Sequence, residues 1–113
     1  KHFGTRAIFA ERDNGKMTLK RGFEIKPGER VLIVEDIVTT GGSVMEVIEV
    51  VKEWGGVIAG VAMLVDRSGG TVDFGVPAKA LLTLDIKTYA PADCPLCKQG
   101  LPLVKRGSRK TPA

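Results

Sequence analysis

The sequence predicts an open α/β fold built around a parallel β-sheet. Two apolar runs, at residues 31–34 and 57–65, are rich in β-branched side chains, and a segment with helical spacing lies between them. Runs of this kind are typical of strands buried on both faces. A strand, a helix and a second strand in this order predict a βαβ unit with parallel strands and a right-handed crossover.

The residues before this unit predict a strand and a hairpin. Residues 5–10 favour a strand with little ahead of it, so we expect a domain that lacks its N-terminal part. Residues 11–16 are polar around Asn14-Gly15, and residues 17–25 alternate loosely between apolar and polar. This pattern predicts a hairpin or a long mobile loop, which a turn at residues 26–29 closes.

The segment between the two apolar runs predicts a helix over residues 44–54. Its apolar side chains recur at positions i, i+3, i+4 and i+7, as on the buried face of a helix. They are Val44, Val47, Ile48 and Val51. The pair Gly55-Gly56 is expected to end the helix, because glycine is favoured just past a helix terminus.

Beyond the second strand the pattern weakens. We expect a short extended segment at residues 72–76, a third strand at 78–86, and one or two helical turns at 93–100. The predicted division is a partial domain over residues 1–104 and a basic, disordered tail over residues 105–113. The tail contains Lys105, Arg106, Arg109 and Lys110.

Composition narrows the possible functions. The chain has 113 residues, of which 43% are hydrophobic and 27% charged, so we expect one folded domain. Much of the net charge of +4 comes from the tail, and one Trp and one Tyr make a poor base-stacking surface, so no nucleic-acid partner is expected. No apolar run approaches the roughly 20 residues of a membrane span, and the start has no secretory pattern. We therefore expect no membrane partner and a cytoplasmic location.

Residues 31–43, VLIVEDIVTTGGS, are the most informative stretch. Glu35 and Asp36 come at the end of the predicted strand, at the edge where open α/β sheets bind ligands. Gly41 and Gly42 can turn the backbone tightly and present N–H groups, next to the positive end of a helix dipole. Hydroxyl donors come from Thr39, Thr40 and Ser43. This combination predicts a phosphate cradle.

The two carboxylates need a different role, since they would repel a phosphate. Glu35 and Asp36 can accept hydrogen bonds from a ribose diol, or hold a hydrated Mg²⁺ beside it. The stretch therefore favours a ribose 5-phosphate site over an ordinary strand-to-helix connection with a good cap. It is neither a Walker A loop nor a dinucleotide fingerprint, because the Gly-Lys-Ser/Thr end and the Gly-x-Gly-x-x-Gly pattern are missing.

This stretch resembles the phosphoribosyl pyrophosphate signature of type I phosphoribosyltransferases, which implies a Rossmann-like core with a parallel sheet. The flanks are similar to those of bacterial orotate phosphoribosyltransferases, and the resemblance runs from Arg6 to about Leu103. The matching flanks are residues 9–12, 15–17, 19–23, 65–70 and 93–97. Members of that family carry a further N-terminal part that this sequence does not show.

The resemblance implies roles for individual residues. Phosphoribosyl pyrophosphate would be bound by Glu35, Asp36, Ile37, Val38, Thr39, Thr40, Gly41, Gly42 and Ser43. Orotate would be bound by Thr39 and Arg67, and a guanidinium fork suits the orotate carboxylate. Catalysis would fall to Lys16, Arg12 and Asp36. Mg²⁺ would be held through the substrate near Glu35 and Asp36 with no direct protein ligand, and the family suggests a homodimer.

Some alternatives stay open. Lys20 and Arg21 either assist the leaving diphosphate or form a solvated hairpin face. The activity could instead be that of a purine or uracil phosphoribosyltransferase, or the chain could be a non-catalytic regulator that binds phosphoribosyl pyrophosphate. For Cys94 and Cys97 a packed structural turn is preferred to half a zinc site or a redox motif.

Overall fold

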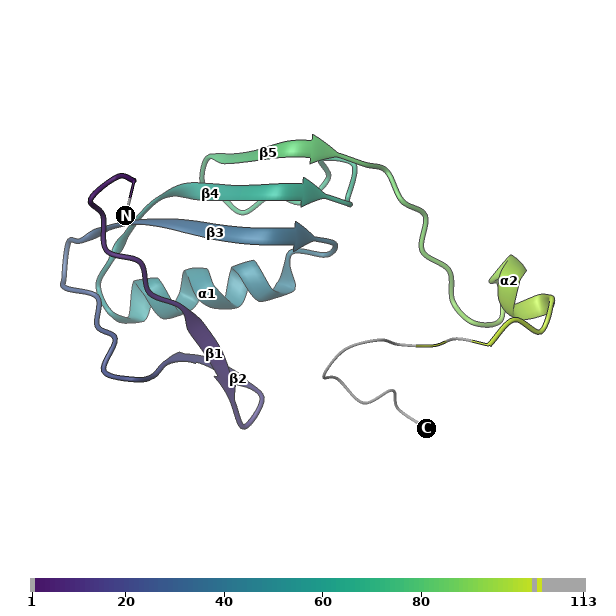
Figure 1. Cartoon of the computed structure of the whole chain (residues 1–113), viewed down its shortest axis with the longest axis horizontal. Helices are drawn as coiled ribbons and strands as arrows, with labels where there is room; N and C mark the ends of the chain where they lie inside the picture. The colour runs from purple at the N-terminus through teal and green to yellow at the C-terminus, as the bar shows by residue number, and fades with distance from the viewer. Residues whose placement is uncertain (1, 103, 105–113) are drawn as a thin grey trace.

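The chain forms a three-stranded sheet with one helix on one face and a hairpin on the far side of that helix (Figure 1). The computed structural model describes residues 2–102 and residue 104. The elements are β1 (Ala10–Asp13), β2 (Lys16–Leu19), β3 (Arg30–Val38), α1 (Gly42–Glu53), β4 (Val57–Asp66), β5 (Ala78–Thr83) and α2 (Pro95–Lys98).

Strands β3, β4 and β5 lie side by side in that order, and both pairings are parallel. The register sets Ile33 opposite Val61 and Val38 opposite Asp66. Because α1 connects β3 to β4, these three elements form the predicted βαβ unit. The prediction of an α/β fold with a parallel sheet is confirmed.

Helix α1 covers one face of this sheet and supplies much of the core. Val44, Ile48 and Val51 are each no more than 2% exposed, and they cluster with Ile33 and Val61 from the strands. The predicted helical spacing is confirmed. The helix begins two residues earlier than predicted and ends at Glu53, just before the glycine pair.

The opposite face of the sheet has no covering layer within the described residues. Register and alternation place Leu32, Val34, Leu64 and Leu81 on it. All four are more than half exposed, and Val34 reaches 70% while its neighbour Ile33 is only 6% exposed. The prediction that residues 31–34 are buried on both faces is therefore wrong for this chain, because the described residues pack against the α1 side of the sheet alone.

Three other local predictions need correction. No strand spans residues 5–10, since β1 begins at Ala10 and pairs only from there with β2. Strand β3 does not stop at Val34 but continues through Glu35 and Asp36 to Val38, because β4 offers pairing partners as far as Asp66. Residues 72–76 are not a strand.

The N-terminal hairpin is confirmed in place of a long loop. Strands β1 and β2 pair antiparallel, with Ala10 opposite Leu19. Their two-residue turn is Asn14-Gly15, with φ angles of 50° and 82°. Positive φ at both turn positions matches the right-handed twist of a hairpin. Strand β2 lies against α1, so the hairpin forms a third layer (Figure 1).

Beyond β5 the chain leaves the sheet and reaches α2 (Figure 1). The helical turn predicted for residues 93–100 is present, but α2 buries none of its residues. Cys94 is half-buried and Cys97 exposed, so the prediction of a packed turn is wrong, because the preceding segment carries α2 away from the core. The tail prediction for residues 105–113 lies outside the described residues.

Neither α1 nor α2, the helices of the described region, is long and apolar enough to cross a membrane.

Neighbouring residues of β3 provide a direct test of this one-sided core. Ile33→Ala should lower the free energy of unfolding by about 2–5 kcal/mol, because it leaves a cavity against α1. Val34→Ala, on the uncovered face, should change it by no more than about 0.5 kcal/mol. Urea unfolding followed by circular dichroism measures both, and equal losses would contradict the described packing.

Candidate functional site

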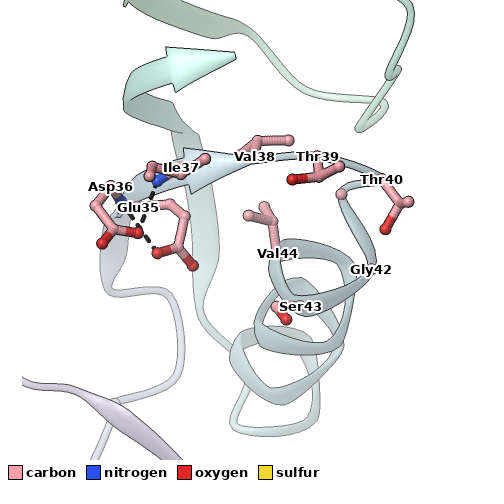
Figure 2. Close-up of a pocket in the computed structure, with 10 residues that line it drawn as sticks. Glu35, Asp36, Ile37, Val38, Thr39, Thr40, Gly42, Ser43 and Val44 are labelled. Carbon is pink, nitrogen blue, oxygen red and sulfur yellow. Dashed lines mark hydrogen bonds between the residues drawn. The ribbon is translucent and has the colours of Figure 1, made fainter. Parts of the chain in front are cut away.

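The predicted phosphate-binding loop lies where β3 ends and α1 begins. Val38 and Val44, each 2% exposed, anchor the two ends of the loop in the core. Residues from Glu35 to Val44 line an open pocket of about 360 Å³. Figure 2 shows the carboxylates at one end of this segment and Thr39 and Thr40 at the other, above the helix start. All nine residues predicted to bind phosphoribosyl pyrophosphate line this pocket.

Gly41 is required by the backbone of the loop. It has a φ of 82° and immediately precedes α1. A Cβ at this position would lie 2.6 Å from Cγ1 of Val72 and 3.0 Å from Cε1 of Phe74. The side chains of residues 72 and 74 therefore close against the loop, a contact that the sequence did not predict.

Gly42 does not have the special turn conformation that was expected of both glycines. It is the first residue of α1, and its φ does not lie in the left-handed region. A Cβ there would meet only Oγ1 of Thr40, at 3.7 Å. The missing side chain of Gly42 is thus not needed for the turn, and its effect is to leave the pocket open.

The start of α1 presents backbone donors to the pocket. Met45 N–H donates to the carbonyl of Gly41 at 2.9 Å, so the N–H groups of Gly42, Ser43 and Val44 lie ahead of the first intrahelical bond. No side chain of the described region caps this end of the helix. These N–H groups, together with the helix dipole, suit a phosphate.

Glu35 and Asp36 differ in their electrostatics. Oε1 of Glu35 accepts a bond from the Asp36 N–H at 3.0 Å, and Oδ1 of Asp36 accepts one from the Ile37 N–H at 2.7 Å (Figure 2). Burial, followed by the neighbouring Asp36 carboxyl, raises the pKa of Glu35. Hydrogen bonding with Glu35, followed by the Ile37 N–H, lowers the pKa of Asp36. Asp36 is therefore the more persistently charged of the two.

The predicted catalytic cations lie outside the pocket. Arg12 donates two bonds to Glu46 of α1, at 2.7 and 2.8 Å. Lys16 lines a separate groove of about 150 Å³ between the hairpin and α1, beside Glu46 and Glu49. The structure thus does not bring Lys16 and Arg12 together with Asp36.

The other two cations of the hairpin region pair with hairpin carboxylates. Lys20 lies 3.1 Å from Asp13, and Arg21 lies 3.2 Å from Glu11. These contacts favour the interpretation of Lys20 and Arg21 as a hairpin face.

Arg67 follows β4 and adjoins the loop through its backbone. Its N–H donates to the carbonyl of Val38 at 2.8 Å, yet the residue does not line the pocket. Its Nε is buried and has no hydrogen-bond partner among the described residues. The next turn is fixed by Asp66, which accepts bonds from the N–H and Oγ of Ser68 at 2.8 and 2.6 Å. These bonds lower the pKa of Asp66.

Metal binding at this site would involve few protein ligands. No three His, Cys, Asp or Glu side chains within residues 2–102 and 104 are grouped to hold a metal ion. Glu35 and Asp36 are the two carboxylates of the pocket that could hold a divalent ion. Mg²⁺ fits this arrangement, because it commonly uses one or two carboxylates together with substrate phosphates.

Comparison with known proteins identifies the family. A model of the phosphoribosyl transferase domain matches residues 4–96. The chain belongs to the phosphoribosyltransferase family. Similar proteins include the orotate phosphoribosyltransferases of Pelotomaculum thermopropionicum, Caldicellulosiruptor bescii and Thermotoga maritima, at 64%, 62% and 60% identity. These matches cover 93–96% of this chain and 55–58% of the relatives, so the chain spans about half the length of the curated phosphoribosyltransferases it matches.

The two adjacent glycines should respond differently to substitution by alanine. Gly41→Ala should lower the free energy of unfolding by more than about 1 kcal/mol, since it combines a left-handed backbone with a collision against Val72. Gly42→Ala should leave it within about 1 kcal/mol, because its backbone is unstrained and Ala favours the helix. Thermal unfolding measures both, and a costlier change at Gly42 would refute this distinction.

The two carboxylates should shift stability in opposite directions. A raised pKa for Glu35 means that its charge opposes folding above its ordinary pKa, so Glu35→Gln should raise the unfolding midpoint at pH 7. A lowered pKa for Asp36 means that its charge supports folding above its ordinary pKa and that this support is lost on acidification. Asp36→Asn should therefore lower the midpoint at pH 7. Both differences should shrink at acid pH, and shifts of the same sign would contradict the assignment.

Proposed function

We propose that this chain carries the phosphoribosyl-transfer site of an orotate phosphoribosyltransferase. The enzyme would transfer the 5-phosphoribosyl group from phosphoribosyl pyrophosphate to orotate, giving orotidine 5′-monophosphate and pyrophosphate in pyrimidine synthesis. The observation that carries the proposal is a single pocket lined by the whole segment from Glu35 to Ser43. Relatives with that activity, similar over nearly all of this chain, support it.

The loop would hold the sugar phosphate by complementary chemistry at its two ends. The backbone donors at the start of α1 and the hydroxyls of Thr39, Thr40 and Ser43 would bind the 5-phosphate. Glu35 and Asp36 would accept hydrogen bonds from the ribose diol. Glu35 and Asp36 would also lie beside a bound Mg²⁺, which would neutralise charge on the leaving diphosphate.

The transfer itself needs no nucleophilic side chain. N1 of orotate forms a bond to C1 of the ribose as the bond to pyrophosphate breaks, through a transition state with oxocarbenium character. Positioning of the two substrates and neutralisation of the diphosphate charge would accelerate the reaction. Lys16 and Arg12 are the candidates for that neutralisation, which requires a movement of the hairpin or a hairpin from a second chain in a homodimer.

Arg67 is proposed to bind the base. Its guanidinium can pair with the orotate carboxylate through two parallel bonds, a geometry that lysine does not reproduce. Its Nε is buried and has no hydrogen-bond partner in the described part of the chain, and a ligand carboxylate that reached it would satisfy this donor. Thr39 would lie next to it at the end of β3. A base without a carboxylate would have no use for this arginine.

The decisive experiment mixes the chain with orotate, phosphoribosyl pyrophosphate and Mg²⁺ and follows the loss of orotate absorbance, with uracil and adenine as controls. Arg67→Lys should lower kcat/KM for orotate about 10- to 100-fold, because a charged bidentate contact is lost. Its affinity for phosphoribosyl pyrophosphate, measured by calorimetry, should be unchanged. Gly42→Ala should instead lower the affinity for phosphoribosyl pyrophosphate, because its methyl group would occupy part of the pocket.

Turnover of uracil or adenine in preference to orotate would sink the assignment of the base. Binding of phosphoribosyl pyrophosphate without turnover of any base would instead favour a non-catalytic regulator. If neither Gly42→Ala nor Arg67→Lys affects either substrate, the pocket at the end of β3 is not the site.

A further inference from the structure

Arg12 joins two layers of the molecule. It lies in strand β1 of the hairpin, and its two terminal nitrogens reach the two carboxylate oxygens of Glu46, in α1, at 2.7 and 2.8 Å. Its Nη1 also donates to the carbonyl of Gly15 at 3.0 Å, which ties the same guanidinium to the hairpin turn. Hairpin turn, strand and helix are thus linked through one side chain.

The partner of Arg12 lies close to the phosphate-binding loop. Glu46 is three residues beyond Ser43 on α1, and residues at this spacing are neighbours on a helix surface. Three residues of helix rise by about 4.5 Å, so the backbone of Glu46 lies roughly one helical turn beyond Ser43, which lines the pocket. A predicted catalytic cation is therefore kept near the site by a carboxylate that sequence analysis did not single out.

The pair has the features of an exchangeable contact. Both side chains are more than a third exposed, at 38% and 41%, and an ion pair in water contributes little to stability. Its two parallel bonds have the geometry in which guanidinium also binds phosphate oxygens. A diphosphate carries more charge than one carboxylate, so it can take Arg12 from Glu46 at small cost.

We propose that Glu46 is a positioning residue that holds Arg12 beside the phosphate-binding loop and yields it to the diphosphate of the substrate. This inference rests on the proposed function, because it takes phosphoribosyl pyrophosphate as the ligand that competes with Glu46. In this proposal Glu46 sets the position of the hairpin through Arg12, and Arg12 alone of the two contacts the substrate.

The chain offers a matched control for Glu46. Glu49 lies one turn further along α1 and lines the same groove as Glu46, and its described ion pair is with Lys52 of the same helix at 3.5 Å. Glu46→Gln and Glu49→Gln therefore remove equal charge from the same helix. Among the ion pairs of residues 2–102 and 104, only the first substitution removes one between α1 and the hairpin.

Two measurements on the full chain test the proposal. Hydrogen exchange of the backbone amides in β1 and β2 should be at least about threefold faster in Glu46→Gln, and unchanged in Glu49→Gln. Calorimetry with phosphoribosyl pyrophosphate and Mg²⁺ should show about two- to fivefold tighter binding by Glu46→Gln, the range expected for release of one exposed ion pair. In an Arg12→Gln background the gain from Glu46→Gln should disappear.

The outcomes separate this inference from the proposed function. An equal gain from Glu49→Gln, or a gain that persists without Arg12, would mean that only the charge of α1 matters, and the proposal would be overturned. Unchanged hairpin exchange in Glu46→Gln would also overturn it, even with sugar-diphosphate binding intact. If the unaltered chain binds no phosphoribosyl pyrophosphate, the proposed function is wrong. The proposed transfer of Arg12 from Glu46 to the diphosphate is then wrong as well.

Discussion

The geometry of the site depends on two valines that clamp the ends of one short turn. Val38 closes β3 and Val44 opens the buried face of α1, and each is 2% exposed. Burial of both side chains fixes where the strand stops and where the helix starts. The five residues between them have little freedom left, so their hydroxyls and N–H groups face one pocket. Binding chemistry at the surface is thus set by packing beneath it.

Sequence patterns anticipated the elements that depend on local periodicity. The spacing of Val44, Ile48 and Val51 gave the helix and its buried face, and Asn14-Gly15 marked the hairpin turn, because both signals act within a few residues. The exposed state of Val34 was not anticipated, since an apolar run does not state whether a second layer covers it. The length of β3 was missed for a similar reason, because the pairing that extends it comes from β4.

In the candidate site, too, features set by contiguous residues were predicted and contacts between distant residues were not. The segment from Glu35 to Ser43 is contiguous, so its chemistry could be interpreted directly from the sequence, and these residues line one pocket. The partner of Arg12 could not be, because Glu46 is 34 residues away and nothing in the local pattern of either residue points to the other. The special backbone freedom expected of both glycines is used by one of them, since neighbouring glycines look alike in sequence while of this pair only Gly41 has the left-handed backbone.

The close approach of Val72 to Gly41 links the segment that follows Arg67 to the turn between β3 and α1. Val72 lies five residues beyond Arg67, and its Cγ1 occupies the space that a side chain at Gly41 would need. A bulkier residue at position 72 would therefore collide with Gly41 and distort the turn between β3 and α1, as a mutation within that turn would. The segment after β4 and the start of α1 are therefore packed together. A side chain outside the pocket lining, that of Val72, constrains the shape of the pocket.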